Sequence, residues 1–116
     1  MNSFMRLISL LKGTGYFIEE SNDGVKFKIP QHVTSLHVIQ DSDGIRVTST
    51  RVFPSFDIRI EVKYSPELGK MVISAHRLFG KEYVSVEYSV GRFVFKREGN
   101  STVVEGKFES STELEG

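Results

Sequence analysis

The sequence predicts a mainly β (α+β) protein: an antiparallel meander of about eight strands in consecutive hairpins, curled into a barrel-like or sandwich sheet, with one amphipathic helix at the amino terminus. Apolar and charged residues alternate without a break over 56–64, apolar residues recur at helical spacing over 4–12, and short turn sequences separate the other β-forming runs. We expect residues 1–109 to form a single β-rich domain, followed by a flexible acidic tail over 110–116.

The alternating run 56–64 is the clearest strand. Successive side chains of a strand point to opposite faces, so this run has one apolar and one charged face, which is typical of an antiparallel sheet that is solvated on one side. The side chains expected inside are Phe56, Ile58, Ile60, Val62 and Tyr64. Those expected in water are Asp57, Arg59, Glu61 and Lys63.

The helix is predicted over 4–12. Its apolar residues fall at i, i+3, i+4 and i+7, on one helical face: Phe4, Leu7, Ile8 and Leu11. We expect Ser3 to cap its start and Gly13 to take a left-handed conformation at its end. The opposite face is not cleanly polar, because it carries Met5 and Leu10. This second apolar surface predicts a protein interface at Met5 and Leu10.

Two-residue turn signals set the expected strand register. Asn22-Asp23 place Ser21 opposite Gly24, which pairs Ile18 with Phe27. Pro30 ends the second strand, and further strands are expected over 33–40, 45–53, 56–64 and 70–79.

The last third contains two more turn signals. Gly91-Arg92 suit a type II′ turn, which would pair Val90 with Phe93 and Tyr88 with Phe95.

Gly99-Asn100 suit a second tight turn, which would place Phe95 opposite Val104 and Phe93 opposite Gly106. Both turns predict the same apolar interior, lined by the rings of Phe93 and Phe95.

Charge and cysteine content limit the function classes. Fifteen basic and fifteen acidic residues cancel, whereas a dedicated duplex-binding domain usually carries a positive excess. The chain has no cysteine, which removes disulfides, thiolate catalysis and cysteine-based zinc sites and fits a reducing compartment. The amino-terminal residues lack a signal-peptide pattern and no run is long enough to span a bilayer, so we expect a soluble cytoplasmic protein without a membrane partner.

No segment carries a catalytic, metal or nucleotide signature. The three histidines lack metal-ligand spacing. Asp41 and Asp43 in Asp-Ser-Asp-Gly look like half of a calcium loop, but the required later glutamate is absent and turn chemistry explains both acids. We therefore expect a protein that is not an enzyme, with no catalytic residue, no metal ligand and no cofactor.

Aromatic residues among basic ones suggest an alternative. The segment Gly91-Arg92-Phe93-Val94-Phe95-Lys96-Arg97 resembles, over seven residues, the aromatic strand of the RRM family, which implies base stacking. The second glycine and the two crossover helices of that family do not occur here, and the two rings share a face with core valines. The alternative function is single-stranded nucleic-acid binding on a curved sheet, with phosphate contacts from Arg59, Lys63, Arg92, Lys96 and Arg97.

The function that the sequence favours is a non-enzymatic protein-interaction or assembly module. Its partner is another protein or a second copy of the chain, including a homodimer, bound through the helix or through an edge strand at the start or end of the meander. Nucleic acid is considered but not favoured as a partner. A carrier of small apolar molecules is a second alternative, because a small barrel can hold a ligand in its mouth.

Overall fold

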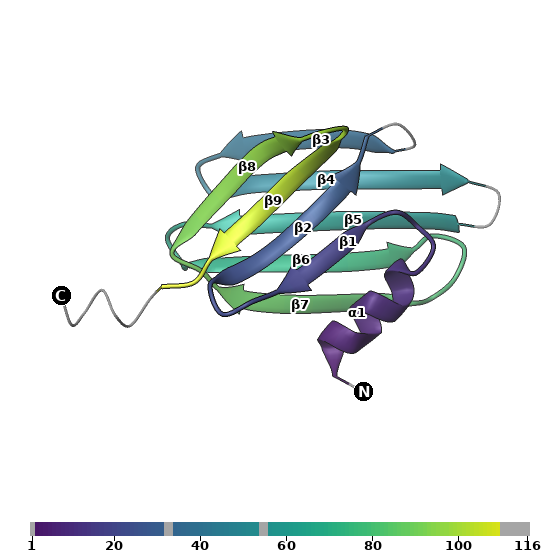
Figure 1. Cartoon of the computed structure of the whole chain (residues 1–116), viewed down its shortest axis with the longest axis horizontal. Helices are drawn as coiled ribbons and strands as arrows, with labels where there is room; N and C mark the ends of the chain where they lie inside the picture. Colours follow the sequence, from purple (N-terminus) through teal and green to yellow (C-terminus); the bar gives the residue numbers. More distant parts are fainter. Residues whose placement is uncertain (1, 32–33, 54–55, 110–116) are drawn as a thin grey trace.

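The protein is a sandwich of two antiparallel sheets with one short helix (Figure 1). The computed structural model describes residues 2–31, 34–53 and 56–109, except for the side chains of 52, 53 and 56. The two sheets are not closed into a barrel, so of the two expected architectures the sandwich is the one formed. Nine strands are described rather than about eight.

The smaller sheet has the strand order β1-β2-β9-β8. Its strands are β1 (Phe17–Glu20), β2 (Gly24–Pro30), β8 (Arg92–Glu98) and β9 (Ser101–Lys107). The larger sheet runs β3-β4-β5-β6-β7 in sequence order. Its strands are β3 (Ser35–Asp41), β4 (Gly44–Phe53), β5 (Phe56–Ser65), β6 (Lys70–Arg77) and β7 (Tyr83–Ser89).

The larger sheet confirms most of the alternation predicted for 56–64. Ile58, Ile60 and Val62 of β5 are fully buried between the sheets, and Tyr64 is partly buried. Asp57 is a correction: it was expected in water but is only 8% exposed. It lies at the start of β5, beside the segment that follows β6, whose Leu78 amide donates to the Asp57 carbonyl oxygen.

The register predicted from two tight turns is confirmed. Ile18 lies opposite Phe27 in the β1–β2 hairpin, and Phe95 lies opposite Val104 in the β8–β9 hairpin. Gly106 faces Phe93 as expected. A Cβ at Gly106 would lie 2.5 Å from Met71 Sδ, so the bare backbone of Gly106 makes room for a side chain of the facing sheet.

The hairpin predicted at Gly91-Arg92 is wrong. β7 pairs with β6 and β8 pairs with β9, so the chain leaves one sheet and enters the other at this point. The Gly91 amide donates to the Lys107 carbonyl, and Val90 is buried between the sheets. A local turn signal cannot distinguish a hairpin from a crossover, which depends on the distant strand β9.

Because of this crossover, the edge strands differ from those expected. The last strand, β9, was expected at an edge but lies between β2 and β8, while the first strand, β1, is an edge as expected. The other edges are β8, β3 and β7. Figure 1 shows β1 and β7 on one side of the sandwich and β8 and β3 on the other.

The helix α1 (Ser3–Leu11) lies across the side formed by β1 and β7 (Figure 1). Its cap is Asn2 rather than the expected Ser3, since Asn2 Oδ1 accepts the Met5 amide at 2.8 Å. Gly13 has φ 76°, which confirms the left-handed end. Within the described residues, no helix is long and apolar enough to cross a bilayer. The predicted acidic tail 110–116 lies outside the described residues.

Candidate functional site: the groove between the helix and the first strand

The two residues nominated for a protein interface, Met5 and Leu10, differ in solvent exposure. Met5 is 49% exposed, whereas Leu10 is only 4% exposed and belongs to the core. The prediction that both lie on one exposed surface is wrong for Leu10. The helix contacts strands of both sheets, so its buried face is wider than the single stripe that the sequence indicated and includes Leu7, Leu10 and Leu11.

A groove runs between α1 and β1. Its volume is about 320 Å³, at the lower end of the range of small-ligand pockets and sufficient for several side chains of a partner. It is lined by apolar side chains, by two glycines and by a single cation, with no carboxylate among them: Ile8, Leu11, Lys12, Gly13, Gly15, Tyr16, Phe17 and Ile18.

Both walls of the groove expose apolar side chains. On α1, Ile8 and Lys12 line the groove, and Met5, three residues before Ile8 on the same helical face, is 49% exposed. On β1, Phe17 is 49% exposed. Phe17 was not nominated from the sequence. It lies between two buried residues, Tyr16 and Ile18, and places a ring on the otherwise charged outer face of its sheet.

The free edge of β1 borders the groove. β1 has a strand neighbour on one side only, β2, so alternate backbone groups on its other side are not used by the sheet. The groove therefore combines a sheet edge with apolar walls.

The loop from Lys12 to Gly15 closes the groove at the end where α1 joins β1. Gly13 and Gly15 have φ values of 76° and 90°, in the left-handed region that glycine adopts without strain. Within the described part of the chain, neither of these amides donates a hydrogen bond, and Lys12 forms no ion pair.

Buried polar contacts fix this loop to the core. Thr14 is fully buried, and its hydroxyl accepts the Tyr16 amide at 3.2 Å. The Tyr16 hydroxyl lies 2.8 Å from Ser49 Oγ on β4, in the other sheet. Burial raises the pKa of Tyr16, so its phenol stays protonated and able to donate. The groove thus has a rigid closed end.

The opposite side of the sandwich also exposes apolar residues. Val38 on β3 and Phe95 on β8 point toward the interior but are 49% and 43% exposed. Phe95 was expected inside, and it is exposed because β8 is an edge strand rather than half of a hairpin with β7. Its neighbour Phe93 stacks on Tyr64 with ring centroids 5.0 Å apart and is partly buried, as predicted.

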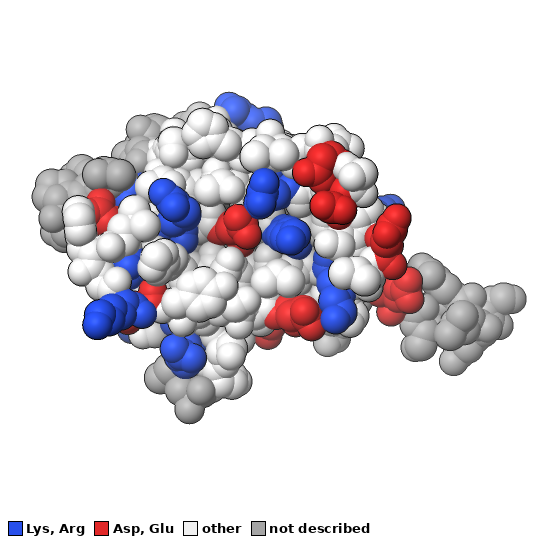
Figure 2. All heavy atoms as spheres, turned by 180° about the vertical axis from the view of Figure 1, so that it is seen from behind, with Lys and Arg blue, Asp and Glu red and all other residues white. Residues whose placement is uncertain are grey.

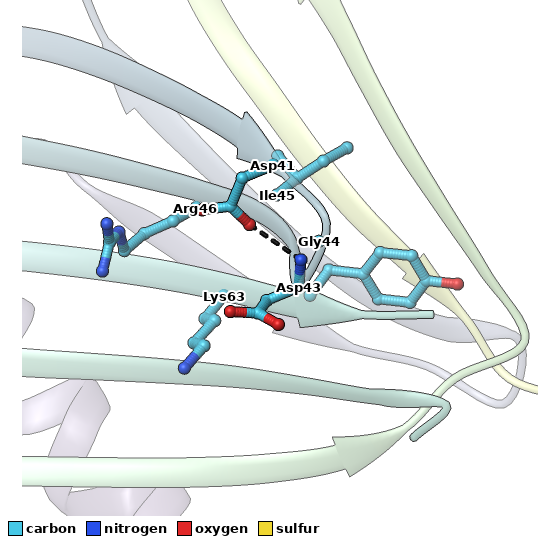
Figure 3. Close-up of a pocket in the computed structure, with 7 residues that line it drawn as sticks. Asp41, Asp43, Gly44, Ile45, Arg46 and Lys63 are labelled. Atoms are coloured by element: carbon cyan, nitrogen blue, oxygen red, sulfur yellow. Dashed lines mark hydrogen bonds between the residues drawn. The ribbon is translucent and has the colours of Figure 1, made fainter. Parts of the chain in front are cut away.

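A smaller hollow lies at the β3–β4 turn on that side (Figure 3). Its volume is about 60 Å³, and charged residues dominate its lining. Asp41 Oδ1 accepts the Asp43 amide at 2.9 Å, which is the turn role expected for these acids. Arg46 and Lys63 also line the hollow, and Figure 3 shows their charged ends extending away from the turn.

The five basic residues nominated for nucleic acid do not share a surface. Arg59 and Lys63 lie on the outer face of the larger sheet, while the other three belong to β8 in the smaller sheet: Arg92, Lys96 and Arg97. Arg97 points to the opposite face of β8 from Lys96 and donates to Gln31 Oε1 at 2.6 Å. On the outer face of the larger sheet, acidic and basic side chains are interspersed (Figure 2).

The outer face of the smaller sheet carries a regular ion-pair lattice. Glu105 accepts from Lys96 and Lys107, both at 2.9 Å, and Glu98 accepts from Lys26 and Lys28. Hydrogen bonds from Lys96 and Lys107 lower the pKa of Glu105 to about 2. These contacts join β2, β8 and β9, and the carboxylates neutralise much of the lysine charge.

In the described part of the chain, no three histidine, aspartate or glutamate side chains are gathered in a way that could hold a metal ion. Comparison of the chain with protein-family models, with curated proteins and with solved structures found no match in any of the three.

Proposed function

We propose that the protein is a non-enzymatic protein-interaction module and that its partner binds in the groove between α1 and β1. The observation that carries the proposal is the groove itself, where the half-exposed side chain of Phe17 lies beside the edge of β1 that pairs with no described strand. In strand addition, main-chain hydrogen bonds to the edge strand give affinity, and pockets that bury alternate apolar side chains give specificity.

The opposite side of the sandwich supports the proposal less well. Among the described residues, the hollow found on that side lies at the β3–β4 turn; it is small and lined mostly by charged residues. The apolar groove rather than the charge of the edge distinguishes the two sides, because both edge strands carry charged residues: Glu19 and Glu20 on β1, and Arg92, Lys96, Arg97 and Glu98 on β8.

Site-specific photo-crosslinking tests the proposal. A benzoylphenylalanine at position 17 is compared with one at position 95, since both replace a half-exposed phenylalanine on an edge strand of the same sheet. In a lysate of the source cells, we expect a discrete adduct from position 17 and none from position 95.

The mass of the adduct and its fragment spectrum identify the partner, and an adduct at twice 13.1 kDa identifies a second copy of the chain. Adduct from position 95 alone, or from neither position, would contradict the proposal. A small apolar molecule that co-purifies and is displaced by Phe17→Lys, without a protein adduct, would replace it with the carrier function.

A further inference from the structure

The groove has a chemical polarity along its length. One end is closed by the Lys12–Gly15 loop, which contains one ammonium group and two backbone amides, those of Gly13 and Gly15, that donate to no described residue. The middle is apolar, between Ile8 on α1 and Phe17 on β1. A ligand that matches this order is apolar along its length and anionic at its end.

Backbone geometry indicates an extended peptide as that ligand. The free edge of β1 carries backbone donors and acceptors that an extended segment laid beside it can pair with. The loop adjoins the amino-terminal end of β1. A peptide whose carboxyl terminus lies at the loop therefore runs antiparallel to β1.

We propose that the groove binds the carboxyl-terminal segment of a partner protein, with its last apolar side chain in the groove and its terminal carboxylate at Lys12 and the Gly13 and Gly15 amides. This inference rests on the proposed function and names the part of the partner that is bound. Backbone amides in successive turns with positive φ form concave sites for anions, and a free carboxylate is the anion that every chain end carries.

Lys12 has a specific task in this arrangement. The last carbonyl groups of α1 carry partial negative charge, which disfavours an anion at the helix end. Two of the nearest carbonyls are already occupied, because Ser9 O accepts the Lys12 amide and Leu11 O accepts the Thr14 amide. The Lys12 ammonium supplies the positive charge that makes this end of the groove attractive to a carboxylate.

The test uses two pools of fluorescently labelled heptapeptides that differ only at the carboxyl terminus. Each pool has apolar residues at alternate positions and ends in Val, Ile, Leu or Phe; one pool has a free carboxylate and the other a carboxamide. Fluorescence anisotropy with the full chain should show about tenfold tighter binding of the free-acid pool, since a charge-assisted hydrogen bond contributes roughly this factor.

Matched variants locate the effect. Lys12→Gln should reduce the free-acid preference to less than about twofold, while Lys81→Gln, another exposed lysine without a described ion pair, should preserve it. Phe17→Lys should weaken both pools, and Phe95→Lys should weaken neither.

Each remaining outcome is decisive. Equal binding of the two pools, weakened by Phe17→Lys, overturns the carboxylate inference and leaves the proposed function standing. Binding that Phe17→Lys does not affect, or no binding by either pool, overturns the inference; if position 17 also gives no crosslink, the proposed function fails with it.

Discussion

The two sides of the sandwich differ in how the interior side chains at the sheet edges are covered. Wherever two twisted sheets meet, the gap between their edge strands exposes interior side chains. Between β1 and β7, α1 fills the gap with Leu7, Leu10 and Leu11, all nearly inaccessible to water. Between β8 and β3, no described element covers the gap, and Val38 and Phe95 are about half exposed.

The two sides therefore differ in how they contribute to stability and in whether they form a binding groove. The helix-covered side buries its apolar residues almost completely and leaves a shaped groove beside the helix. On the open side, the edge strand β8 pairs with β9 along its length, and the ion pair between Lys96 and Glu105 adds to this pairing. The comparison predicts that truncating an apolar side chain lowers the stability more on the helix-covered side, and that a fall in pH lowers the stability more on the open side.

The largest effect is expected from the anchor of the helix. Leu7→Ala removes a fully buried side chain and should lower the free energy of unfolding by about 2–4 kcal/mol. Phe95→Ala on the open side should lower it by less than about 1.5 kcal/mol, because that ring is 43% exposed. Urea denaturation followed by circular dichroism measures both. Equal effects would contradict the distinction between the two sides.

Acid should weaken the open side next. The pKa of Glu105 is lowered to about 2 by its two lysine partners, below its ordinary value of 4.5. A lowered pKa means that the stabilisation is complete above pH 4.5 and is lost as the pH falls toward 2. We expect a loss of about 1–2 kcal/mol from this group.

Amide hydrogen exchange at pH 5 and pH 3 measures where this loss occurs. Protection of β8 should fall more than protection of α1, and Glu105→Gln should remove most of the difference between the two pH values. A greater loss at α1 than at β8 would show that the charge lattice does not hold the open side.

The helix cap gives a smaller effect on the covered side. Asn2→Ala removes the acceptor of the Met5 amide and should cost about 1 kcal/mol, whereas Ser3→Ala should change stability by less than about 0.5 kcal/mol. Thermal unfolding compares the two. A larger loss of stability from Ser3→Ala than from Asn2→Ala would show that Ser3, as the sequence indicated, is the cap.

The smallest effect on stability is expected at β3. Ile39 is 47% exposed on an edge strand that has no Asp, Glu, Lys or Arg from Ser35 to Gln40. Ile39→Lys should change the free energy of unfolding by no more than about 0.5 kcal/mol but should slow aggregation of the heated protein, because a lysine on an edge opposes strand pairing. Static light scattering during heating measures this, with Phe79→Lys, in the β6–β7 loop, as the control. Equal protection by both variants would mean that β3 is not the aggregating edge.

The same two sides show what the sequence can and cannot predict. The alternation of 56–64 predicts its buried face, and the tight turns at 22–23 and 99–100 predict their strand registers, because each depends on residues close together in the chain. The turn at 91–92 was misassigned, since the pairing of β8 depends on β9 rather than on β7. The exposure of Phe95 follows from that error.

The candidate site was only half predictable for the same reason. Met5 could be identified from helical periodicity, but the burial of Leu10 depends on contact with strands of both sheets. The groove itself joins a helix stripe to the edge of β1, and no spacing in the sequence shows where that edge lies. Phe17 left a recognisable signal, as an apolar residue on an otherwise charged face.

The most direct test is an amide NMR titration of the uniformly ¹⁵N-labelled chain with the free-acid heptapeptide pool. We predict progressive chemical-shift changes at Ile8, Lys12, Gly13, Gly15 and Phe17, and shifts of β3 and β8 amides no larger than the spectral noise. Shifts centred on Val38 and Phe95, with the groove amides unchanged, would show that the open side is the binding surface.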